Sequence, residues 1–285
     1  MRVTILGSAA GGGFPQWNCG CPGCVAVREG RDGFDARTQD SVAVTNDGER
    51  FVLFNASPDI LAQIKNTHAL WPKRARHSPI AAVVLTNGDM DHVLGLFSLR
   101  ESYPFEIWAT ESVWRGLEEN AFLRTLRRFE GHTKRAVLPL DDEVDIAGLR
   151  VRARAAPGKA PVHLMGHAEP SPEDNVMLSV GGSRLLYAAA CASAEVDLSG
   201  HAVVLFDGTF YREDELVRLG LSKAVAKDMA HVPIASSLAM PLGNCRKIYT
   251  HINNTNPILD PSSEERRAVE AAGWEVAYDG MEIDA

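Results

Sequence analysis

Three of the five cysteines fall within six residues, in the run Cys19-Gly20-Cys21-Pro22-Gly23-Cys24. Thiolates are soft ligands for Zn²⁺, and the glycines and proline between Cys19, Cys21 and Cys24 let the backbone fold round one ion. A single buried cysteine needs no such neighbours, so the spacing favours a structural zinc site over redox chemistry or chance. A tetrahedral site needs a fourth ligand, which the spacing does not identify.

A second cluster, Thr86–His92, follows the apolar run Ala81–Leu85. A buried strand that ends in carboxylates and an imidazole presents them together at its carboxyl end, where layered α/β proteins build their sites. Asp89, Asp91 and His92 therefore predict metal binding. The alternative is a helix N-terminus capped by one aspartate, which leaves the other aspartate and the histidine unexplained.

A third cluster, His251–Pro257, again follows a predicted strand and contains Asn253, Asn254 and Asn256. A buried amide needs several hydrogen bonds. The functional interpretation is therefore a histidine ligand, His251, braced by an amide network that orients the metal ligands or the substrate. The alternative is the turn chemistry of an exposed loop.

Two further positions carry polar groups that chemistry could use. Asp207 ends a predicted strand and precedes Gly208, and His231 precedes Val232-Pro233. An aspartate before a glycine is often only a turn, and a lone histidine of this kind is more often packed than catalytic.

Short β-branched runs bounded by Gly, Pro, Asn or Asp predict the strands that position these clusters. The runs are Val3–Leu6, Ser41–Val44, Phe51–Phe54, Ala81–Leu85, Glu106–Trp108, Gly148–Val151, Asn175–Ser179, Leu185–Tyr187, Ala202–Phe206, Lys247–Tyr249 and Trp274–Ala277. Helical spacing covers Pro58–Lys65, His92–Glu101, Glu111–Phe129 and Ser262–Ala272. The mixed order predicts two sheets face to face with helices outside, a four-layer αββα sandwich, in a single domain of residues 1–285. The alternative is a plain doubly wound sheet.

Charge and hydropathy argue against several kinds of partner. The 37 acidic and 29 basic residues give a net charge of −8, which opposes binding to nucleic acid or to an anionic membrane. No run of about 18 apolar residues is present, so we expect no membrane segment. Met1–Gly7 has no signal-peptide profile, and we therefore expect a cytoplasmic protein.

The sequence resembles the metallo-β-lactamase superfamily in the order of three motifs along the chain. These are a T-N-G-D-M-D-H loop, a D-G-T-F strand end and an H-I-N-N-T-N-P strand end. More narrowly, motifs from Gly7–Cys24 to Ala277–Met281 resemble the pyrroloquinoline quinone biosynthesis protein B family over nearly the whole chain. The resemblance implies an αββα sandwich with its metal site at one sheet edge. It also implies a role in the biosynthesis of pyrroloquinoline quinone (PQQ), with a small peptide-derived precursor as partner.

Departures from the superfamily's HxHxDH motif bear on the chemistry. The motif's first two histidines hold one metal ion, and its aspartate and last histidine serve a second. Here the corresponding positions read Asn87, Asp89, Asp91 and His92. With His251 matching the last ligand histidine, the second site survives as Asp91, His92 and His251.

Other ligands of the first site are also missing from their expected positions. The third-motif histidine would fall near Pro157–Lys159, although His163 and His167 lie a little downstream. The bridging aspartate expected after Leu185–Tyr187 is replaced by alanine and Cys191. The resemblance therefore implies ligands for one metal ion rather than two.

One carboxylate and two imidazoles with open positions form the facial triad of non-haem Fe(II) oxygenases. The family resemblance implies an Fe(II)- and O₂-dependent hydroxylation of the tyrosine ring in a Glu-Tyr-derived PQQ precursor. In that mechanism Asp89 and Asp207 are acids outside the ligand set. His231, which resembles a catalytic histidine of the phosphodiesterase and ribonuclease branches, is a proton donor.

The resemblance also bears on the cysteine cluster. The spacing of Cys19–Cys24 is similar to the structural zinc loop of the phosphodiesterase branch. There the fourth ligand lies three residues after the last-motif histidine, which maps to Asn254. An asparagine is a weak ligand for zinc.

Two other functions stay open. The first is a zinc-dependent hydrolase of phosphodiesters or of a peptide intermediate, which needs two ions in the pocket. The second is a carrier without catalysis, involved in transport of PQQ or its precursor. The number of bound ions separates hydrolysis from oxidation.

Overall fold

The computed structural model describes residues 1–128, 130–161 and 169–285. Strands within these ranges are β1 (Arg2–Gly7), β2 (Ser41–Thr45), β3 (Phe51–Phe54), β4 (Ile80–Val84), β5 (Phe105–Ala109), β6 (Thr133–Val137), β7 (Glu143–Ile146), β8 (Leu149–Ala155), β9 (Val176–Val180), β10 (Leu185–Ala188), β11 (Val203–Asp207), β12 (Arg246–Thr250), β13 (Trp274–Val276) and β14 (Glu282–Asp284). The α-helices are α1 (Pro22–Arg28), α2 (Ile60–Asn66), α3 (Met90–Val93), α4 (Glu111–Glu118), α5 (Leu123–Leu126), α6 (Glu215–Arg218), α7 (Ile234–Ser237) and α8 (Glu264–Ala271). Short 3-10 helices are η1 (His68–Leu70), η2 (Leu94–Ser98), η4 (Ala226–Met229) and η5 (Pro257–Leu259).

The strands form two sheets of seven strands each among the described residues. The first sheet has the order β14-β1-β2-β3-β4-β5-β6, and the second has the order β13-β12-β11-β10-β9-β8-β7. Strands β3 to β6 run parallel, as do β10 to β13, and the remaining neighbours are antiparallel. Parallel neighbours bring the carboxyl ends of successive strands to one edge of a sheet.

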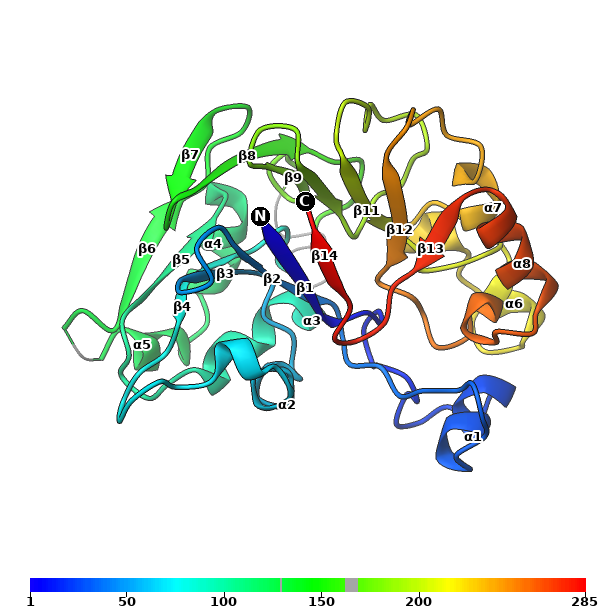
Figure 1. Ribbon diagram of the computed structural model, residues 1–285, viewed down its shortest axis with the longest axis horizontal. Coiled ribbons are helices and arrows are strands. Elements are labelled where there is room, and N and C mark those ends of the chain that lie inside the picture. The colour runs from blue at the N-terminus through cyan, green and yellow to red at the C-terminus, as the bar shows by residue number, and fades with distance from the viewer. Residues whose placement is uncertain (129, 162–168) are drawn as a thin grey trace.

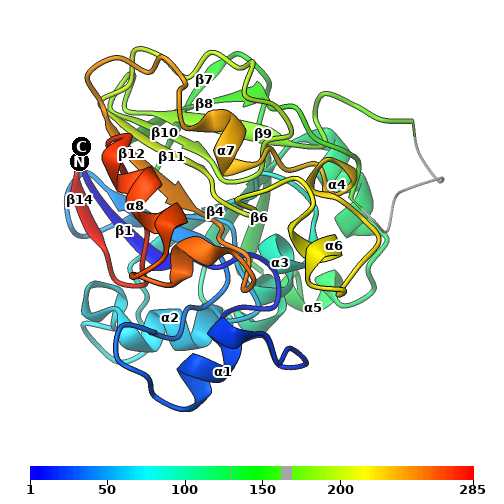
Figure 2. The same cartoon turned by 90° about the vertical axis from the view of Figure 1, so that its right-hand side faces the viewer.

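The two sheets, with helices on their outer faces, make four layers (Figures 1 and 2). Three apolar clusters hold these layers together. The inner cluster joins residues of both sheets, such as Val44 and Leu205, and fills the space between them. A second cluster packs α8 against the outer face of the second sheet through Val269 and Trp274. The third packs α2 and α4 on the outer face of the first sheet through Ile60 and Trp114. The predicted αββα sandwich is therefore confirmed, and a plain doubly wound sheet is not.

Three strands were not predicted from the sequence, and each belongs to a sheet margin. β6 and β7 end the two sheets, and β14 pairs with β1 at the opposite margin of the first. Their sequences, such as Thr133-Lys134-Arg135-Ala136-Val137, carry charges because an edge strand faces water and must resist pairing with other chains. The two chain ends lie side by side, and Ala285 donates its N–H to the carbonyl of Met1 at 2.8 Å.

Two helical predictions were too long. The stretch His92–Glu101 is a single α-turn, α3, continued by η2, because Gly95 packs so tightly that a Cβ there would lie 2.1 Å from the carbonyl oxygen of Ser57. The stretch Glu111–Phe129 divides into α4 and α5. Asn120 lies at the break and accepts the N–H of Phe122 on its side-chain oxygen.

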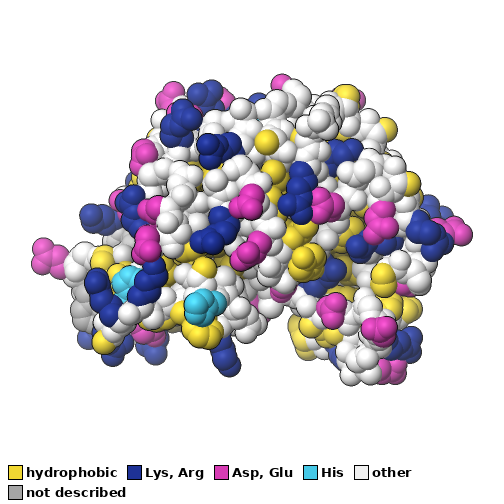
Figure 3. Space-filling model, in the orientation of Figure 1, with side chains coloured by type: hydrophobic (Ala, Val, Ile, Leu, Met, Phe, Trp, Pro, Cys, Tyr) yellow, Lys and Arg dark blue, Asp and Glu magenta, His cyan; other side chains and the backbone are white. Residues whose placement is uncertain are grey.

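No helix among the described residues has the length and apolar character needed to cross a bilayer. Basic and acidic side chains are interspersed over the face of the molecule drawn in Figure 3. That mixture agrees with the modest negative net charge of −8.

Candidate metal centres

The loops that follow β4, β11 and β12 meet at one end of the sandwich. Backbone hydrogen bonds hold these loops: the N–H of Asn253, after β12, donates to Thr209, after β11, at 3.1 Å, and the N–H of Val176 in β9 donates to Thr86, after β4, at 2.9 Å. The loop after β1 joins them, since Ala10 donates its N–H to Ile252 at 2.9 Å. Residues far apart in the sequence are thereby held within one rigid frame.

Three candidate ligands converge in this frame. Ligand atoms of Asp91, His92 and His251 all lie within 4.8 Å of one another. His251 Nε2 lies 3.2 Å from Asp91 Oδ2, and the rings of His92 and His251 meet edge to face with centroids 5.3 Å apart. The described residues therefore include one carboxylate and two imidazoles in an arrangement that could hold a single ion.

His92 is oriented as a metal ligand would be. Its Nδ1 donates to Asn87 Oδ1 at 2.8 Å, which leaves Nε2 as the ring nitrogen with the lone pair. Nε2 is buried and has no hydrogen-bond partner among the described residues. Burial lowers the pKa of His92, so the ring is neutral at neutral pH. A buried, neutral and unpartnered nitrogen fits a bound metal ion, because such a polar atom is otherwise costly.

Asp91 and His251 form an ion pair. Burial opposes the charge on Asp91, but the His92 and His251 imidazoles outweigh it and hold the pKa of the carboxyl well below its usual range. Burial likewise opposes the charge on His251, but Asp91 raises its pKa to about 9. His251 Nδ1 donates to Thr209 Oγ1 at 2.8 Å, which fixes the ring. The backbone of His251 has a φ of 55°, a left-handed conformation that costs energy and that is common at functional sites.

Asp207 and His231 form a second pair beside the trio of Asp91, His92 and His251. Asp207 is fully buried and accepts hydrogen bonds from Cys191 N, Thr209 N and Thr209 Oγ1. His231 Nδ1 donates to Asp207 Oδ2 at 2.7 Å, and the His231 ring stacks on His251 with centroids 5.3 Å apart. Burial opposes ionisation of Asp207, but His231 and the other donors lower the pKa of its carboxyl. Atoms of Asp207, His231 and His251 also lie within 4.8 Å of one another.

A cavity of about 490 Å³ opens over these groups, a volume typical of small-molecule sites. Asp89 lines it, and although Asp89 is the N-cap residue of α3, its side chain makes no capping hydrogen bond. Gly11 lines it as well, and a Cβ there would lie 3.1 Å from Asp91 Oδ2, so a glycine leaves room beside the carboxylate. A larger cavity of about 740 Å³ lies at the opposite ends of β4 and β5 and contains none of the candidate residues.

A buried polar network that the sequence did not reveal lies beneath the trio. Tyr187 donates to Asp40 Oδ2, and Thr250, the residue before His251, donates to Asp40 Oδ1 at 2.8 Å. Asn55 donates to the Tyr187 hydroxyl at 3.0 Å and accepts from the Thr86 hydroxyl at 3.1 Å. Burial raises the pKa of Asp40. The network connects both sheets to the loops that carry the histidines.

The three asparagines after His251 have different surroundings. Asn253 lines the cavity, and its amide donates to Thr255 at 2.6 Å. Asn256 lies outside the cavity and donates to the carbonyl of Gly208 at 2.8 Å, so it supports the loop that carries Thr209. Asn254 is at the cysteine cluster and does not line this cavity. His163 and His167 lie outside the described residues.

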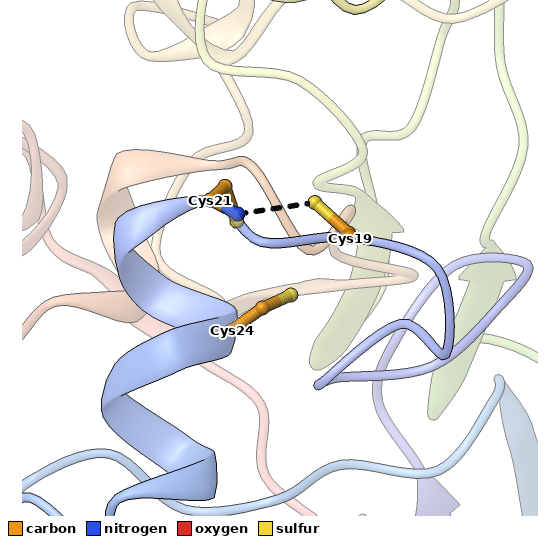
Figure 4. Close-up of side chains that lie close together, drawn as sticks. All are labelled: Cys19, Cys21 and Cys24. Atoms are coloured by element: carbon orange, nitrogen blue, oxygen red, sulfur yellow. Dashed lines mark hydrogen bonds between the residues drawn. The ribbon is translucent and has the colours of Figure 1, made fainter.

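The cysteine cluster forms a second centre at the start of α1 (Figure 4). The sulfurs of Cys19, Cys21 and Cys24 lie within 4.8 Å of one another. The N–H of Cys21 points at Cys19 Sγ at 3.4 Å, and Asn254 Nδ2 lies 3.3 Å from Cys24 Sγ. Burial and the neighbouring sulfurs raise the pKa of Cys21 to about 11, whereas hydrogen bonds overcome burial and lower that of Cys19. Three thiols with an amide beside them match a site for a thiophilic ion.

Glu215, the first residue of α6, connects this helix to the loop that follows His251. Its carboxylate accepts from Thr255 Oγ1 at 2.5 Å and from Tyr211 N at 2.7 Å. Burial raises the pKa of Glu215 from 4.5 to about 7. A raised pKa means that the folded state binds the proton more tightly. The stability that this tighter proton binding gives to the folded protein is therefore complete below pH 4.5 and is lost as the pH rises through 7.

We expect Glu215→Gln to become more stable relative to the wild type as the pH rises from about 5 to 8, by about 2–3 kcal/mol in the free energy of unfolding. Urea unfolding at the two pH values measures the difference. Glu119→Gln changes an exposed glutamate after α4 and serves as the control. An offset between Glu215→Gln and the wild type that does not depend on pH would show that Glu215 stays ionised in the folded protein.

Comparison with known proteins agrees with this architecture. Residues 50–252 match the model of the Beta-lactamase superfamily domain. A diphosphatase of the PhnP family shares the fold, with a TM-score of 0.72 and 21% identity over 100% of this chain and 97% of its own. The sandwich and its metal-binding edge thus define a protein of the metallo-β-lactamase superfamily.

More similar proteins narrow the assignment. The chain is 46% identical to coenzyme PQQ synthesis protein B of Methylobacterium sp. (strain 4-46) and 41% identical to that of Xanthomonas oryzae pv. oryzae, over 99% of each chain. The crystal structure of Zn²⁺-bound PqqB from Methylobacterium extorquens superposes with a TM-score of 0.92, at 40% identity and full coverage of both chains. The chain belongs to the coenzyme PQQ synthesis protein B family.

Proposed function

We propose that this chain takes part in PQQ biosynthesis as a mononuclear Fe(II)- and O₂-dependent hydroxylase of the tyrosine ring in a Glu-Tyr-derived precursor. The names of its relatives support the pathway. One observation supports the chemistry: Asp91, His92 and His251 offer one carboxylate and two imidazoles within 4.8 Å of one another. That donor set is the facial triad of non-haem iron oxygenases.

Each residue then has a defined task. Asp91, His92 and His251 would hold the ion, and bound Fe(II) would supply the activation of O₂. Asn87 keeps the lone pair of His92 on Nε2. The Nδ1–H of His231 donates a hydrogen bond to the buried Asp207 carboxylate. This leaves Nε2 as the ring nitrogen that can hold or release a proton in the cavity.

Hydroxylation of the ring requires a defined set of reactants. One oxygen atom of O₂ converts a ring C–H bond into C–OH, and the other leaves as water. The balance needs two electrons and two protons for each turnover. The assay must therefore contain an external two-electron reductant such as ascorbate.

The test is anaerobic reconstitution with Fe(II), addition of the dipeptide Glu-Tyr and reductant, and exposure to air. We expect a product heavier by one oxygen atom, with ¹⁸O from ¹⁸O₂ in the ring. The zinc-loaded protein should give no product. If the iron-loaded protein also gives none, while its iron content is one ion per active centre, the proposed hydroxylation is wrong.

We also propose that Cys19, Cys21 and Cys24 hold a structural Zn²⁺ and that Asn254 completes its shell. The amide of Asn254 lies 3.3 Å from Cys24 Sγ and 3.6 Å from Cys21 Sγ. The orientation of an amide is assigned from its neighbours, so a bound ion would turn the oxygen toward the sulfurs. We further propose that the protein acts in the cytoplasm, where reducing conditions keep its thiols free for metal.

A second candidate function is a zinc-dependent hydrolase, and one observation favours it. Asp207, His231 and His251 form another possible donor set that shares His251 with the first. Two adjacent ions there would suit hydrolysis. Two metal ions per active-site cavity would support this function, one ion would support oxidation, and binding of a quinone without turnover would support a carrier.

A further inference from the structure

The lining of the cavity over the trio includes a cationic side chain that has no task in the proposed hydroxylation. Among the described residues that line it, Lys159 is the one lysine or arginine. Its Nζ donates to the carbonyl of Asp228 at 3.3 Å, and no carboxylate of the described residues lies within the 4.0 Å of an ion pair. The ammonium therefore keeps positive charge available to a ligand.

The backbone that carries Lys159 is firmly held. A Cβ at Gly158 would lie 2.7 Å from Asn175 Nδ2, so the chain passes this amide more closely than any side chain allows. Asn175 accepts from Asn87 Nδ2 at 3.3 Å, and Asn87 in turn orients His92. Lys159 is thus anchored in the same amide cluster that aims a candidate metal ligand.

The charge on this side of the cavity is suited to an anion. The HxHxDH motif would supply a metal ligand at position 87, but Asn87 is a neutral amide and is paired with the amide of Asn175. Lys159 adds a positive charge that repels a second divalent ion and attracts a carboxylate. Asp89 is the other charged group of the lining besides the trio.

Apolar side chains line the same cavity. Phe210 is almost completely buried and meets the His231 ring edge to face, with centroids 6.1 Å apart. Met229 and Met90 also line the cavity. Flexible thioethers and an aromatic ring edge suit a planar aromatic group of the ligand.

We propose that Lys159 binds a carboxylate of the substrate and that the aromatic ring of the same molecule lies against Phe210 and Met229, facing the trio. The substrate class is an aromatic amino acid derivative or short peptide with a free carboxylate. This inference rests on the proposed function, because it describes how the substrate of the same cavity is recognised.

The test uses zinc-loaded protein, because Zn²⁺ has no redox chemistry and binding is then measured without oxidation. Calorimetric titration compares two probes of similar size: Glu-Tyr, with two carboxylates, and Gln-Tyr amide, with none. We expect the wild type to prefer Glu-Tyr by at least about tenfold, and Lys159→Gln to lose about 10- to 100-fold in affinity for Glu-Tyr but not for the amide. Lys159→Arg keeps the charge and should recover most of the preference.

Lys227→Gln is the matched control, because Lys227 is exposed on the neighbouring η4 and does not line the cavity. It should leave both affinities unchanged. Equal losses for the two probes would mean that Lys159 only supports the fold through its contact with Asp228. A wild type that binds both probes alike, or Lys159→Gln that keeps the preference, overturns the proposal.

The outcome is separable from that of the hydroxylase assay. Lys159-dependent binding without any hydroxylation by the iron-loaded protein rejects the proposed function and leaves the carboxylate site standing. Normal hydroxylation with no dependence of binding on Lys159 rejects the carboxylate site alone.

Discussion

His92→Ala should remove the ion of the active centre and reduce turnover by more than about 100-fold. Loss of a hydrogen bond that supports a metal ligand costs about 10- to 100-fold, and loss of the ligand itself should cost more. His92 Nε2 is buried and has no partner among the described residues, so its principal use is as a ligand. The hydrogen bond between Asp91 and His251 involves no atom of His92 and should survive. The fold is therefore expected to persist while the metal is lost.

The measurement is elemental analysis of metal per chain after anaerobic loading, together with the hydroxylation assay. We expect one ion fewer than in the wild type, with the ion of the cysteine cluster retained. Asn87→Ala should weaken metal binding by about 10- to 100-fold, because it frees the His92 ring to rotate. His68→Ala changes an exposed histidine near α2 and should alter neither quantity.

Full metal content in His92→Ala would mean that the ion binds elsewhere. The alternative is the second donor set of Asp207, His231 and His251. In that case His231→Ala rather than His92→Ala should lose the ion, because His231 belongs to that set alone. Loss in both variants would indicate a pair of ions and would favour the hydrolase.

The residues of the trio could be predicted because each follows an apolar strand with unusual polar types. Val84 and Thr250 end β4 and β12, and the loops beyond them present Asp91, His92 and His251 at one edge. A strand end can be identified locally, since the change from β-branched to polar residues is a property of neighbouring positions. The predicted fold followed from the same signal.

The supporting groups could not be predicted, because their roles depend on contacts between distant segments. Asp40 is separated by 147 positions from Tyr187 and by 210 from Thr250 in the hydrogen bonds that it accepts. Lone polar residues inside apolar stretches give no sign of such pairing. Asn254 lies 230 positions from Cys24, so the local sequence does not reveal their contact, and only the family resemblance placed Asn254 at the cysteine cluster.

Removal of the cysteine centre should have the largest effect on stability. α1 has seven residues, too few for an isolated helix to be stable, and Cys24 in its first turn is completely buried. If Zn²⁺ binds the three thiolates, its binding free energy is part of the folding free energy of this segment. We expect Cys24→Ala to lower the melting temperature by at least about 10 °C.

The effect should reach the active centre, because Asn254 contacts Cys24 and lies three positions after His251 in the same loop. Differential scanning calorimetry and metal analysis of Cys24→Ala, with Cys245→Ala as the control at a half-buried thiol outside the cluster, measure both consequences. A chelator that strips the wild type should reproduce the lower melting temperature, because it removes the same ion. If Cys24→Ala keeps both its melting temperature and its zinc, the cluster is not a metal site. A redox role for the thiols would then account better for their spacing.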